Sequence, residues 1–199
     1  MDHPDTDESL VRRYREGSAA AFETLVQRHS ARVYHLCLRI LGDPDEAADA
    51  SQDAFLTAVR KLDTFRGEAA FTTWLHRVTV NACYDSLRRK RRQPMLRLIR
   101  EDDDEPLDAG PPVPDHAAGV DLSIDVQQAL RSVPEDFRVA LVLADVEDLP
   151  YERIAEILGV AVGTVKSRVF RGRAALGRAL GVAGAREPAD PSRASEEEA

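Results

Sequence analysis

The stretch that decides the fold is Tyr151-Glu-Arg-Ile-Ala-Glu-Ile-Leu-Gly-Val-Ala-Val-Gly-Thr-Val-Lys-Ser-Arg-Val-Phe-Arg-Gly-Arg173. Its spacing predicts a helix-turn-helix. Ala155 is small enough to let two helices approach closely, and Gly159, four residues later, suits the left-handed conformation that ends a helix. Val165 follows six residues further on, where the second helix must fill the space between the two. We therefore expect two helices joined by a tight turn.

The second of these helices carries cations and no acids. At helical spacing its apolar side holds Val165, Val169, Gly172 and Leu176. Its other sides present the candidate DNA-contacting residues Thr164, Lys166, Ser167, Arg168, Phe170 and Arg171. A cationic helix of this kind fits the major groove, where Arg and Lys pair with guanine edges and phosphates. An ordinary helical hairpin with a solvated basic face is the alternative that these residues alone leave open.

Charge is segregated along the chain. The net charge of −8 argues against a protein that coats nucleic acid through bulk attraction. Residues 72–100 nevertheless hold eight Arg or Lys against the single acid Asp85, and residues 163–180 hold five with no acid. Acids concentrate instead at 43–53, at 101–108 and near both ends. The two basic segments therefore predict local contacts with a polyanion on a protein that is acidic overall.

The composition gives little support to other classes of protein. No apolar run reaches membrane-spanning length, and the N-terminus lacks the features of a signal peptide, so we expect a cytoplasmic protein without membrane insertion. Cys37 and Cys83 form no CxxC motif, and the five histidines lack metal-ligand spacing, so neither a metal nor a cofactor is expected. Cys37 is interpreted as a buried structural thiol, with a redox pair to Cys83 as the alternative.

Apolar residues recur at helical spacing for most of the length, and strand signals are almost absent. The predicted fold class is all-α, with two small helical domains at 1–92 and 120–180. The proline-rich and acidic stretch 93–119 is expected to be a flexible linker, and 181–199 a disordered tail. In the first domain we expect four helices. The first covers 8–16, the second starts after the capping residue Ser18, and the others cover 43–62 and 71–92. The third begins with Asp43 as N-cap and Pro44 at its first position.

The helix from Phe71 is expected to bury one side, made of Phe71, Trp74, Leu75, Val78 and Ala82. Another side carries Thr73, Arg77, Val80, Asn81, Tyr84, Arg88 and Arg91. Such a mixture of cations, an amide and an aromatic suits unstacked bases, which need stacking surfaces and hydrogen-bond partners. The helix ends in five consecutive cations at 88–92, more than a match to the helix dipole requires, so phosphate contact is the favoured interpretation.

The helix from Asp43 is acidic on one side, which holds Asp45, Asp49, Gln52, Asp53 and Leu56. The opposite side, with Ala48, Phe55, Val59 and Leu62, is expected to face the core. From the residues alone a solvated acidic face is the favoured interpretation. Leu56 among the acids also fits a docking surface for a basic protein partner.

Further motifs occur in a fixed order along the chain. In the first domain they are Ala21-Phe-Glu-Thr-Leu-Val, Asp43-Pro-Asp-Glu-Ala-Ala-Asp-Ala-Ser-Gln-Asp-Ala-Phe-Leu56 and Phe71-Thr-Thr-Trp-Leu-His-Arg-Val-Thr-Val-Asn81 after Phe65-Arg-Gly. In the second they are Val133-Pro-Glu-Asp-Phe-Arg, Tyr151-Glu-Arg-Ile-Ala and Gly163-Thr-Val-Lys-Ser-Arg-Val-Phe-Arg-Gly-Arg173. Together they resemble a bacterial RNA polymerase sigma factor of the extracytoplasmic-function type, in the sigma-70 family.

The resemblance implies an initiation factor, not an enzyme, whose partners are promoter DNA, RNA polymerase core and an anti-sigma factor. It implies contact with the β flap, and docking on the β′ clamp helices through Asp49, Gln52, Asp53 and Leu56. The −10 element would be opened and held by the loop 63–70 and the following helix, through Phe65, Arg66, Trp74, Arg77, Asn81, Tyr84 and Arg88. The second domain would read the −35 element through Thr164, Lys166, Ser167, Arg168, Phe170 and Arg171.

Three places depart from the family pattern. Ala161 stands where Ser or Pro often opens the recognition helix, and Leu149-Pro150 replaces a Ser-type cap before Tyr151. Ala50-Ser51 interrupts the apolar character usually seen before the Gln-Asp pair. Two other functions stay open at this point. One is a dimeric helix-turn-helix repressor or activator that binds a palindrome. The other is a metal-dependent nuclease that uses Asp45, Asp49 and Asp53.

Overall fold

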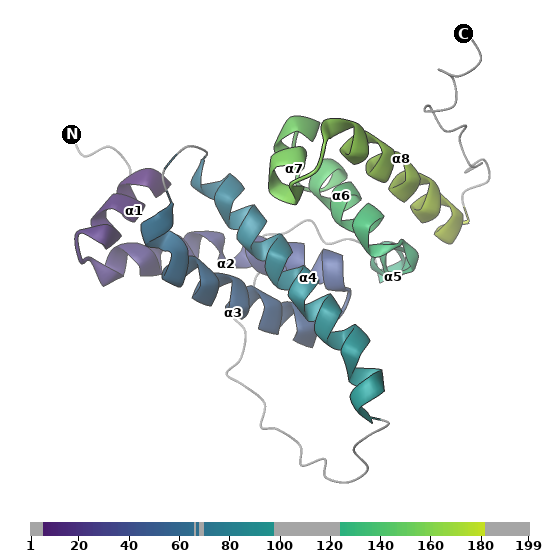
Figure 1. Cartoon of the computed structure of the whole chain (residues 1–199), viewed down its shortest axis with the longest axis horizontal. Helices are drawn as coiled ribbons and strands as arrows, with labels where there is room; N and C mark the ends of the chain where they lie inside the picture. Colours follow the sequence, from purple (N-terminus) through teal and green to yellow (C-terminus); the bar gives the residue numbers. More distant parts are fainter. Residues whose placement is uncertain (1–5, 66, 68–69, 98–123, 182–199) are drawn as a thin grey trace, which may run out of the picture. The chain divides into compact units, whose positions relative to one another are not determined.

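The computed structural model describes residues 6–65, 67, 70–97 and 124–181 (Figure 1). This part of the chain is helical and contains no β-strand, which confirms the predicted all-α class. The chain divides into two compact units, Met1–Asp121 and Leu122–Ala199, each with its own apolar core. Most of the predicted linker and all of the tail from 182 onward lie outside the described residues.

The N-terminal unit contains α1 (Asp7–Arg15), α2 (Ala19–Leu41), α3 (Pro44–Lys61), the short 3-10 helix η1 (Leu62–Thr64) and α4 (Phe71–Arg97). The predicted start of α3 is confirmed, because the Asp43 carboxylate accepts the backbone N–H groups of Asp45 and Glu46, each at 3.0 Å. Gly42 ends α2 in the left-handed conformation, with φ of 77°. These signals divide the N-terminal chain into helices near the predicted positions.

Helices α2, α3 and α4 pack against one another, and α1 lies against α2 (Figure 1). The prediction for the inner face of α3 is wrong in part. Its buried stripe consists of alanines, Ala47, Ala50, Ala54 and Ala58, whereas Ala48, Phe55 and Val59 are only half-buried. Small side chains at this spacing let the α3 backbone approach its neighbours, so close packing takes the place of large apolar side chains.

Helix α4 is longer than the sequence pattern predicted. It runs to Arg97, five residues beyond the expected end at Arg92 and through Pro94. Proline removes one backbone hydrogen bond and disfavours helix at the residue before it, which is why an end at this point was expected. The residues after Pro94 are Met, Leu and Arg, which are strong helix formers, and the helix continues through them.

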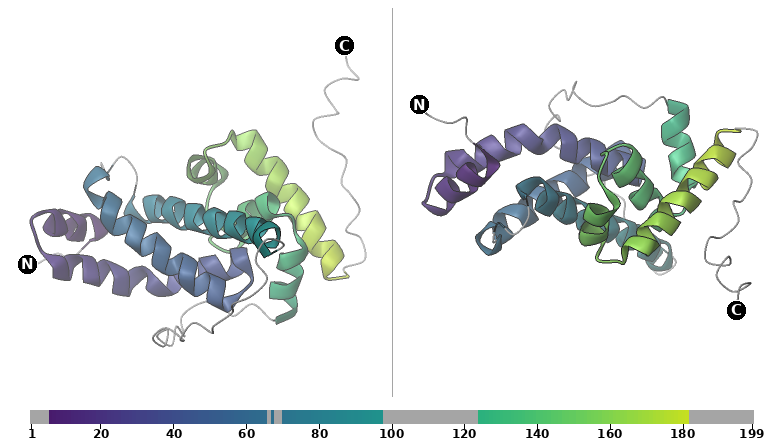
Figure 2. Two further views of the ribbon diagram at one scale, coloured as in Figure 1. Left: turned by 60° about the horizontal axis from the view of Figure 1, so that its bottom comes forward. Right: turned by 90° about the horizontal axis from the view of Figure 1, so that it is seen from above.

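The C-terminal unit contains α5 (Ile124–Ser132), α6 (Glu135–Asp145), α7 (Tyr151–Leu158) and α8 (Val162–Ala179). Helices α5, α6 and α7 all contact α8, and Figure 2 shows α6 and α8 running beside one another. Buried Arg138 of α6 donates to the backbone carbonyls of Leu130 and Arg131, at 3.4 and 3.2 Å, and so ties the end of α5 to α6. This unit holds α7 and α8 in the predicted helix-turn-helix order.

Candidate nucleic-acid interface

The turn between α7 and α8 has the predicted geometry. Gly159 ends α7 in the left-handed conformation, with φ of 66°, and Val165 is fully buried where the two helices meet. Pro150 and Ala161 occupy the N-cap positions of α7 and α8, and neither side chain caps its helix. The expected weak cap on the recognition helix is therefore present.

The inner side of α8 lies very close to α6. Val165, Val169 and Gly172 are buried, as expected, and Leu176 is half-buried. A Cβ atom added at Gly172 would lie 2.9 Å from the carbonyl oxygen of Phe137 and 3.2 Å from the Cβ of Leu141. Glycine is thus required at this position for space, since any side chain would push the two helices apart.

The outer side of α8 presents a polar and aromatic surface. Thr164, Lys166, Phe170 and Arg171 are exposed, and Ser167 is half-buried. Phe170 is a large apolar side chain that exposes 37% of its surface. The Arg171 guanidinium lies 5.9 Å from the ring centroid of Phe137, a cation–π distance. Five of the six predicted −35 residues therefore reach the surface of one helix.

Two cations of α8 are engaged with acids of α6. Arg168 pairs with Asp136 at 3.1 Å, and its side chain is only 22% exposed. Arg173 donates to both carboxylate oxygens of Asp145, from Nε at 2.9 Å and from a terminal nitrogen at 2.6 Å, and this hydrogen bonding raises the pKa of Arg173 above its ordinary value. The structure thus places Arg168, a predicted DNA contact, against α6. Arg173 binds α8, the second helix of the helix-turn-helix, to α6.

Helix α4 presents the second candidate surface. Arg77, Asn81 and Arg88 are exposed and Tyr84 is half-buried, so four of the predicted −10 residues share one side of the helix. Val80, which the sequence pattern placed on the same side, is buried and belongs to the core. Arg88 also pairs with Asp85 within the helix.

The start of α4 is held by an aromatic cluster of Phe65, Phe71 and Trp74. The centroid of Phe65 lies 5.9 Å from that of Phe71 and 5.5 Å from that of Trp74. Phe65 is only 7% exposed, so its ring packs inward, whereas Trp74 is half-buried. Arg66, the remaining predicted −10 residue, lies outside the described residues. Of the predicted −10 set, Phe65 is thus part of the packing beneath the surface, and Trp74 lies half-buried beside it.

Sequence reasoning missed one residue next to this cluster. A terminal nitrogen of Arg15, the last residue of α1, donates to the backbone carbonyls of Leu62, at 2.8 Å, of Asp63, at 3.3 Å, and of Phe65. No local pattern could have found it, because the partners lie 47 to 50 positions away and offer only their backbones. A tertiary contact of this kind becomes visible only in the folded chain.

The acidic side of α3 is exposed as predicted. Asp49, Gln52 and Leu56 face solvent, and Leu56 exposes 45% of its surface. Asp53 is half-buried and pairs with Arg89 of α4 at 3.1 Å. Lys90 of the same basic run pairs with Glu46 at 2.6 Å. Part of the basic run 88–92 is thus directed at α3, and the acidic surface is partly neutralised from within the chain.

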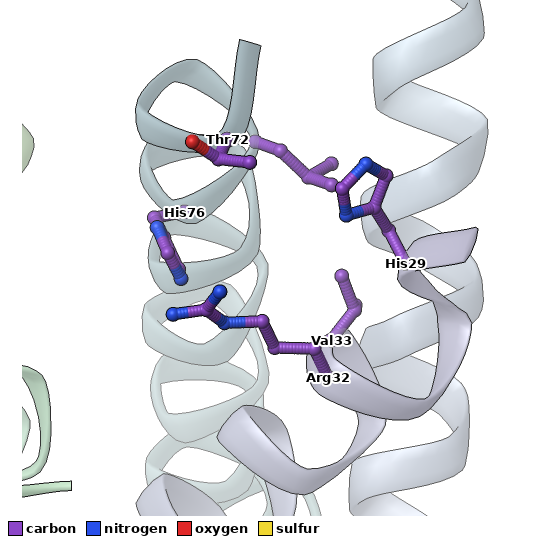
Figure 3. A pocket seen from close by; sticks show the side chains of 6 residues that line it. His29, Arg32, Val33, Thr72 and His76 are labelled. Carbon is purple, nitrogen blue, oxygen red and sulfur yellow. The ribbon is translucent and has the colours of Figure 1, made fainter. Parts of the chain in front are cut away.

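A small hollow between α2 and α4 is lined by His29, Arg32, Val33, Thr72, Leu75 and His76 (Figure 3). Figure 3 shows Arg32 reaching from α2 toward the side of the hollow formed by His76. His29 hydrogen-bonds the Asp7 carboxylate at 2.9 Å. Burial lowers the pKa of His29 below its ordinary value of 6.5, although Asp7 acts in the opposite direction.

Cys37 of α2 and Cys83 of α4 are both buried as free thiols. A hydrogen bond with Cys83 and burial together raise the pKa of Cys37 well above its ordinary value. This places Cys37 in the core, as predicted. Across the described ranges, no three His, Cys, Asp or Glu side chains are grouped to hold a metal ion, and no helix is long and apolar enough to span a membrane.

A cationic helix-turn-helix in one helical unit, with a basic helix and an acidic surface in another, defines a two-domain DNA-binding protein. The family model of Sigma-70 region 2 matches residues 25–93, and that of Sigma-70 region 4 matches residues 123–176. The ECF RNA polymerase sigma factor SigM of Mycobacterium tuberculosis is 40% identical over 90% of this chain and 87% of its own length. The chain therefore belongs to the sigma-70 family of RNA polymerase sigma factors, and to its extracytoplasmic-function type.

Other relatives agree with this assignment. The RNA polymerase sigma-H factor of Pseudomonas aeruginosa is 36% identical over 88% of this chain and 94% of its own length. Among solved structures, the sigma factor RpoE in complex with the anti-sigma factor NepR from Bartonella quintana is similar with a TM-score of 0.64 and 26% identity, covering 81% of this chain and 98% of that one. CnrH in complex with the cytosolic domain of CnrY gives a TM-score of 0.62, also at 26% identity, over 88% and 97% of the two chains.

Proposed function

We propose that this protein binds core RNA polymerase and directs it to promoters by reading the −35 element with α8 and opening the −10 element with α4. The observation that carries the proposal is the presence of both sigma-70 regions, in order, in one chain. Each region also has an exposed surface suited to nucleic acid. The exposed residues of α8 that serve the −35 element are Thr164, Lys166, Phe170 and Arg171, with Ser167 beside them.

The proposed action requires no covalent chemistry from this chain. Unpairing bases costs a few kcal/mol per base, and stacking and hydrogen bonding to the released bases offset that cost. Arg77, Asn81 and Tyr84 on α4 offer a cation, an amide and an aromatic ring for this purpose. We infer that the protein is an initiation factor rather than an enzyme, and that it acts in the cytoplasm, where its polymerase works.

The acidic surface of α3 is the proposed docking site on the polymerase. Asp49, Gln52 and Asp53 precede exposed Leu56 on the same side of α3, so an apolar contact would have acids beside it. Acids beside an exposed apolar side chain suit a basic partner surface, and the clamp helices of β′ are the proposed partner. The β flap is the proposed partner of the C-terminal unit.

An anti-sigma factor is a proposed partner as well. The proposal is supported by two structural relatives, a complex of RpoE with the anti-sigma factor NepR and a complex of CnrH with the cytosolic domain of CnrY. A protein that covers the exposed surfaces of α3 or α8 would prevent contact with polymerase or promoter. Pull-down from the native host with the tagged chain, followed by inhibition of transcription by the captured protein, tests this partner.

Specificity is proposed to arise from linkage of two weak DNA contacts. When polymerase fixes the distance between the two units, binding by one raises the effective concentration of the other at its element. Run-off transcription with purified core polymerase over a promoter library tests the function directly. The expected result is transcription from a subset with shared −35 and −10 sequences, and footprinting should show protection that depends on core. Strong protection by the isolated protein, equal to that with core, would contradict the linkage.

A further inference from the structure

Arg15 connects two elements that are remote in sequence. It is the last residue of α1, and its guanidinium lies beside the end of α3, where η1 leads toward α4. One terminal nitrogen donates to the carbonyls of Leu62 and Asp63, at 2.8 and 3.3 Å, and to that of Phe65. Three backbone carbonyls within four residues of chain thus accept hydrogen bonds from a single cationic group.

The chemistry of this contact favours a firm anchor. The last carbonyls of a helix lack intrahelical donors and carry the negative end of the helix dipole. A guanidinium meets both needs, and hydrogen bonds from a charged donor are stronger than neutral ones. The chain also turns here through a backbone bond from the Phe65 N–H to the Leu62 carbonyl, at 3.2 Å. Arg15 therefore holds the 3-10 turn and the residue that follows it.

The anchor acts on the start of α4 through Phe65. The Phe65 ring is buried against Phe71 and Trp74, which form the first turn of α4, and these two rings lie 5.7 Å apart. Fixing the Phe65 backbone therefore fixes one member of the cluster from which α4 begins. Arg77 and Asn81 follow on the exposed side of the same helix.

We infer that Arg15 is a positioning residue for −10 recognition, which acts by holding Leu62–Phe65 and, through the Phe65–Phe71–Trp74 cluster, the first turns of α4. The inference rests on the proposed function of α4 in opening the −10 element. It adds that α1, which contributes no expected DNA contact, controls how well α4 performs that function.

Loss of Arg15 should leave α1 in place. Asp7 at the other end of α1 pairs with Arg28 at 2.5 Å and with His29 at 2.9 Å, and Leu10 and Val11 are buried. These contacts fasten α1 to α2 independently of the contact with η1. A variant at position 15 therefore tests the anchor without removing the helix.

The test compares full-length Arg15→Ala and Arg15→Lys with the matched control Arg12→Ala, which removes an exposed cation from the same helix. Trp74 is the single tryptophan of the chain, so acrylamide quenching of its fluorescence reports on the cluster alone. Hydrogen exchange at the Leu62–Phe65 amides reports on the anchored turn. Permanganate reactivity of an opened −10 element, with saturating core polymerase, reports on function.

For Arg15→Ala we expect faster exchange at Leu62–Phe65, stronger quenching of Trp74 and about a tenfold loss of promoter opening, the size expected when a charge-assisted anchor is lost. Affinity for core and for the −35 element should not change. Arg15→Lys, which keeps a charged donor with three N–H groups, should recover part of the opening, and Arg12→Ala should match the unsubstituted protein.

The outcomes separate this inference from the proposed function. Normal opening by Arg15→Ala beside an active unsubstituted protein overturns the inference alone. Unchanged exchange and quenching also overturn it, because the anchor would then hold nothing. If the unsubstituted protein with core opens no promoter, the proposed function is overturned, and the role of Arg15 in recognition with it, whatever the fluorescence shows.

Discussion

Arg89 of α4 donates to Asp53 of α3 across 3.1 Å, so a cation of the basic run neutralises an acid of the proposed polymerase-docking surface. Both side chains remain about half exposed, at 58% and 46%. An exposed ion pair contributes only about 0.2–1 kcal/mol, so a partner can replace either member at little cost. Docking of Asp53 on polymerase would therefore release Arg89, and core binding would make a cation available for DNA.

Substitution of the two partners should have opposite effects on polymerase. Asp53→Ala should lower affinity for core, because it removes an acid from the docking surface. Arg89→Ala should leave that affinity unchanged or raise it, because it removes the internal competitor, while stability falls by no more than about 1 kcal/mol. Fluorescence titration of each full-length variant with core measures this. Equal losses of core affinity in both variants would show that the intact pair, and not the free acid, is the feature that polymerase binds.

The exposed and the paired arginines of α8 should differ in their effect on promoter choice. Arg171→Ala should cost about 1–3 kcal/mol at one position of the −35 element and relax preference there, as expected for a base contact. Arg168 pairs with Asp136. Its replacement by alanine should therefore lower affinity only slightly, and by the same amount for every −35 sequence. Competition binding of holoenzyme to single-base −35 variants measures both. Relaxed preference at one base pair in Arg168→Ala would show that this side chain leaves Asp136 to read DNA.

Local signals in the sequence were sufficient to predict much of the fold. Asp43 starts α3, Gly159 ends α7 and Val165 is buried between α7 and α8, and each follows from the chemistry of a residue and its near neighbours. The order of the helices and the exposed side of α8 follow from helical periodicity in the same way. These features are decided within a few turns of chain.

Features decided by tertiary contacts could not be derived in the same way. The alanine stripe of α3 was missed because a periodicity argument favours large apolar residues, whereas Ala50 and Ala54 bury fully by close approach. Phe65 was expected to face DNA, and its inward position depends on Phe71 and Trp74. The pairing of Arg168 with Asp136 likewise joins residues 32 positions apart. No local pattern therefore distinguishes an arginine that contacts DNA from one that is held in an ion pair within the protein.

Gly163 and Gly172, two of the three glycines of α8, provide a matched test of its packing. Gly172→Ala should destabilise the C-terminal unit by about 1–3 kcal/mol, because the new Cβ would meet the backbone carbonyl of Phe137, which cannot move aside cheaply. Gly163→Ala meets nothing within 4 Å and should be neutral or stabilising by up to about 1 kcal/mol, since alanine favours helix. Hydrogen exchange of the α6 and α8 amides in the full chain measures both. Comparable exchange in the two variants would contradict the close approach of α6 and α8.

The buried thiols should be inert while the protein is folded. The thiolate is the reactive form, and the raised pKa of Cys37 lowers its thiolate fraction at pH 8 below that of an ordinary cysteine. Because both thiols are also buried, iodoacetamide should modify Cys37 and Cys83 only slowly in the native protein. In denaturant it should modify both, and mass spectrometry can count the added groups. Rapid modification of either thiol under native conditions would show that the space between α2 and α4 opens readily, and it would favour the redox alternative.

His29 should make folding stability depend on pH. Its pKa is lowered in the folded state, chiefly by burial, with Arg28 and Arg32 acting in the same direction and Asp7 opposing them. The unfolded chain then takes up this proton at a higher pH than the folded one. The resulting stability is present above the unfolded pKa of 6.5 and is lost as pH falls through the folded value.

The control for this pH dependence is His29→Gln, which keeps a donor for the Asp7 carboxylate but cannot be protonated. Urea unfolding of both proteins, followed by Trp74 fluorescence between pH 8 and a pH of about 5.5, gives the difference in unfolding free energy. That difference should shift in favour of the variant as pH falls. A shift in favour of the native protein would mean that Asp7 outweighs burial and that the imidazolium is the form stabilised in the fold.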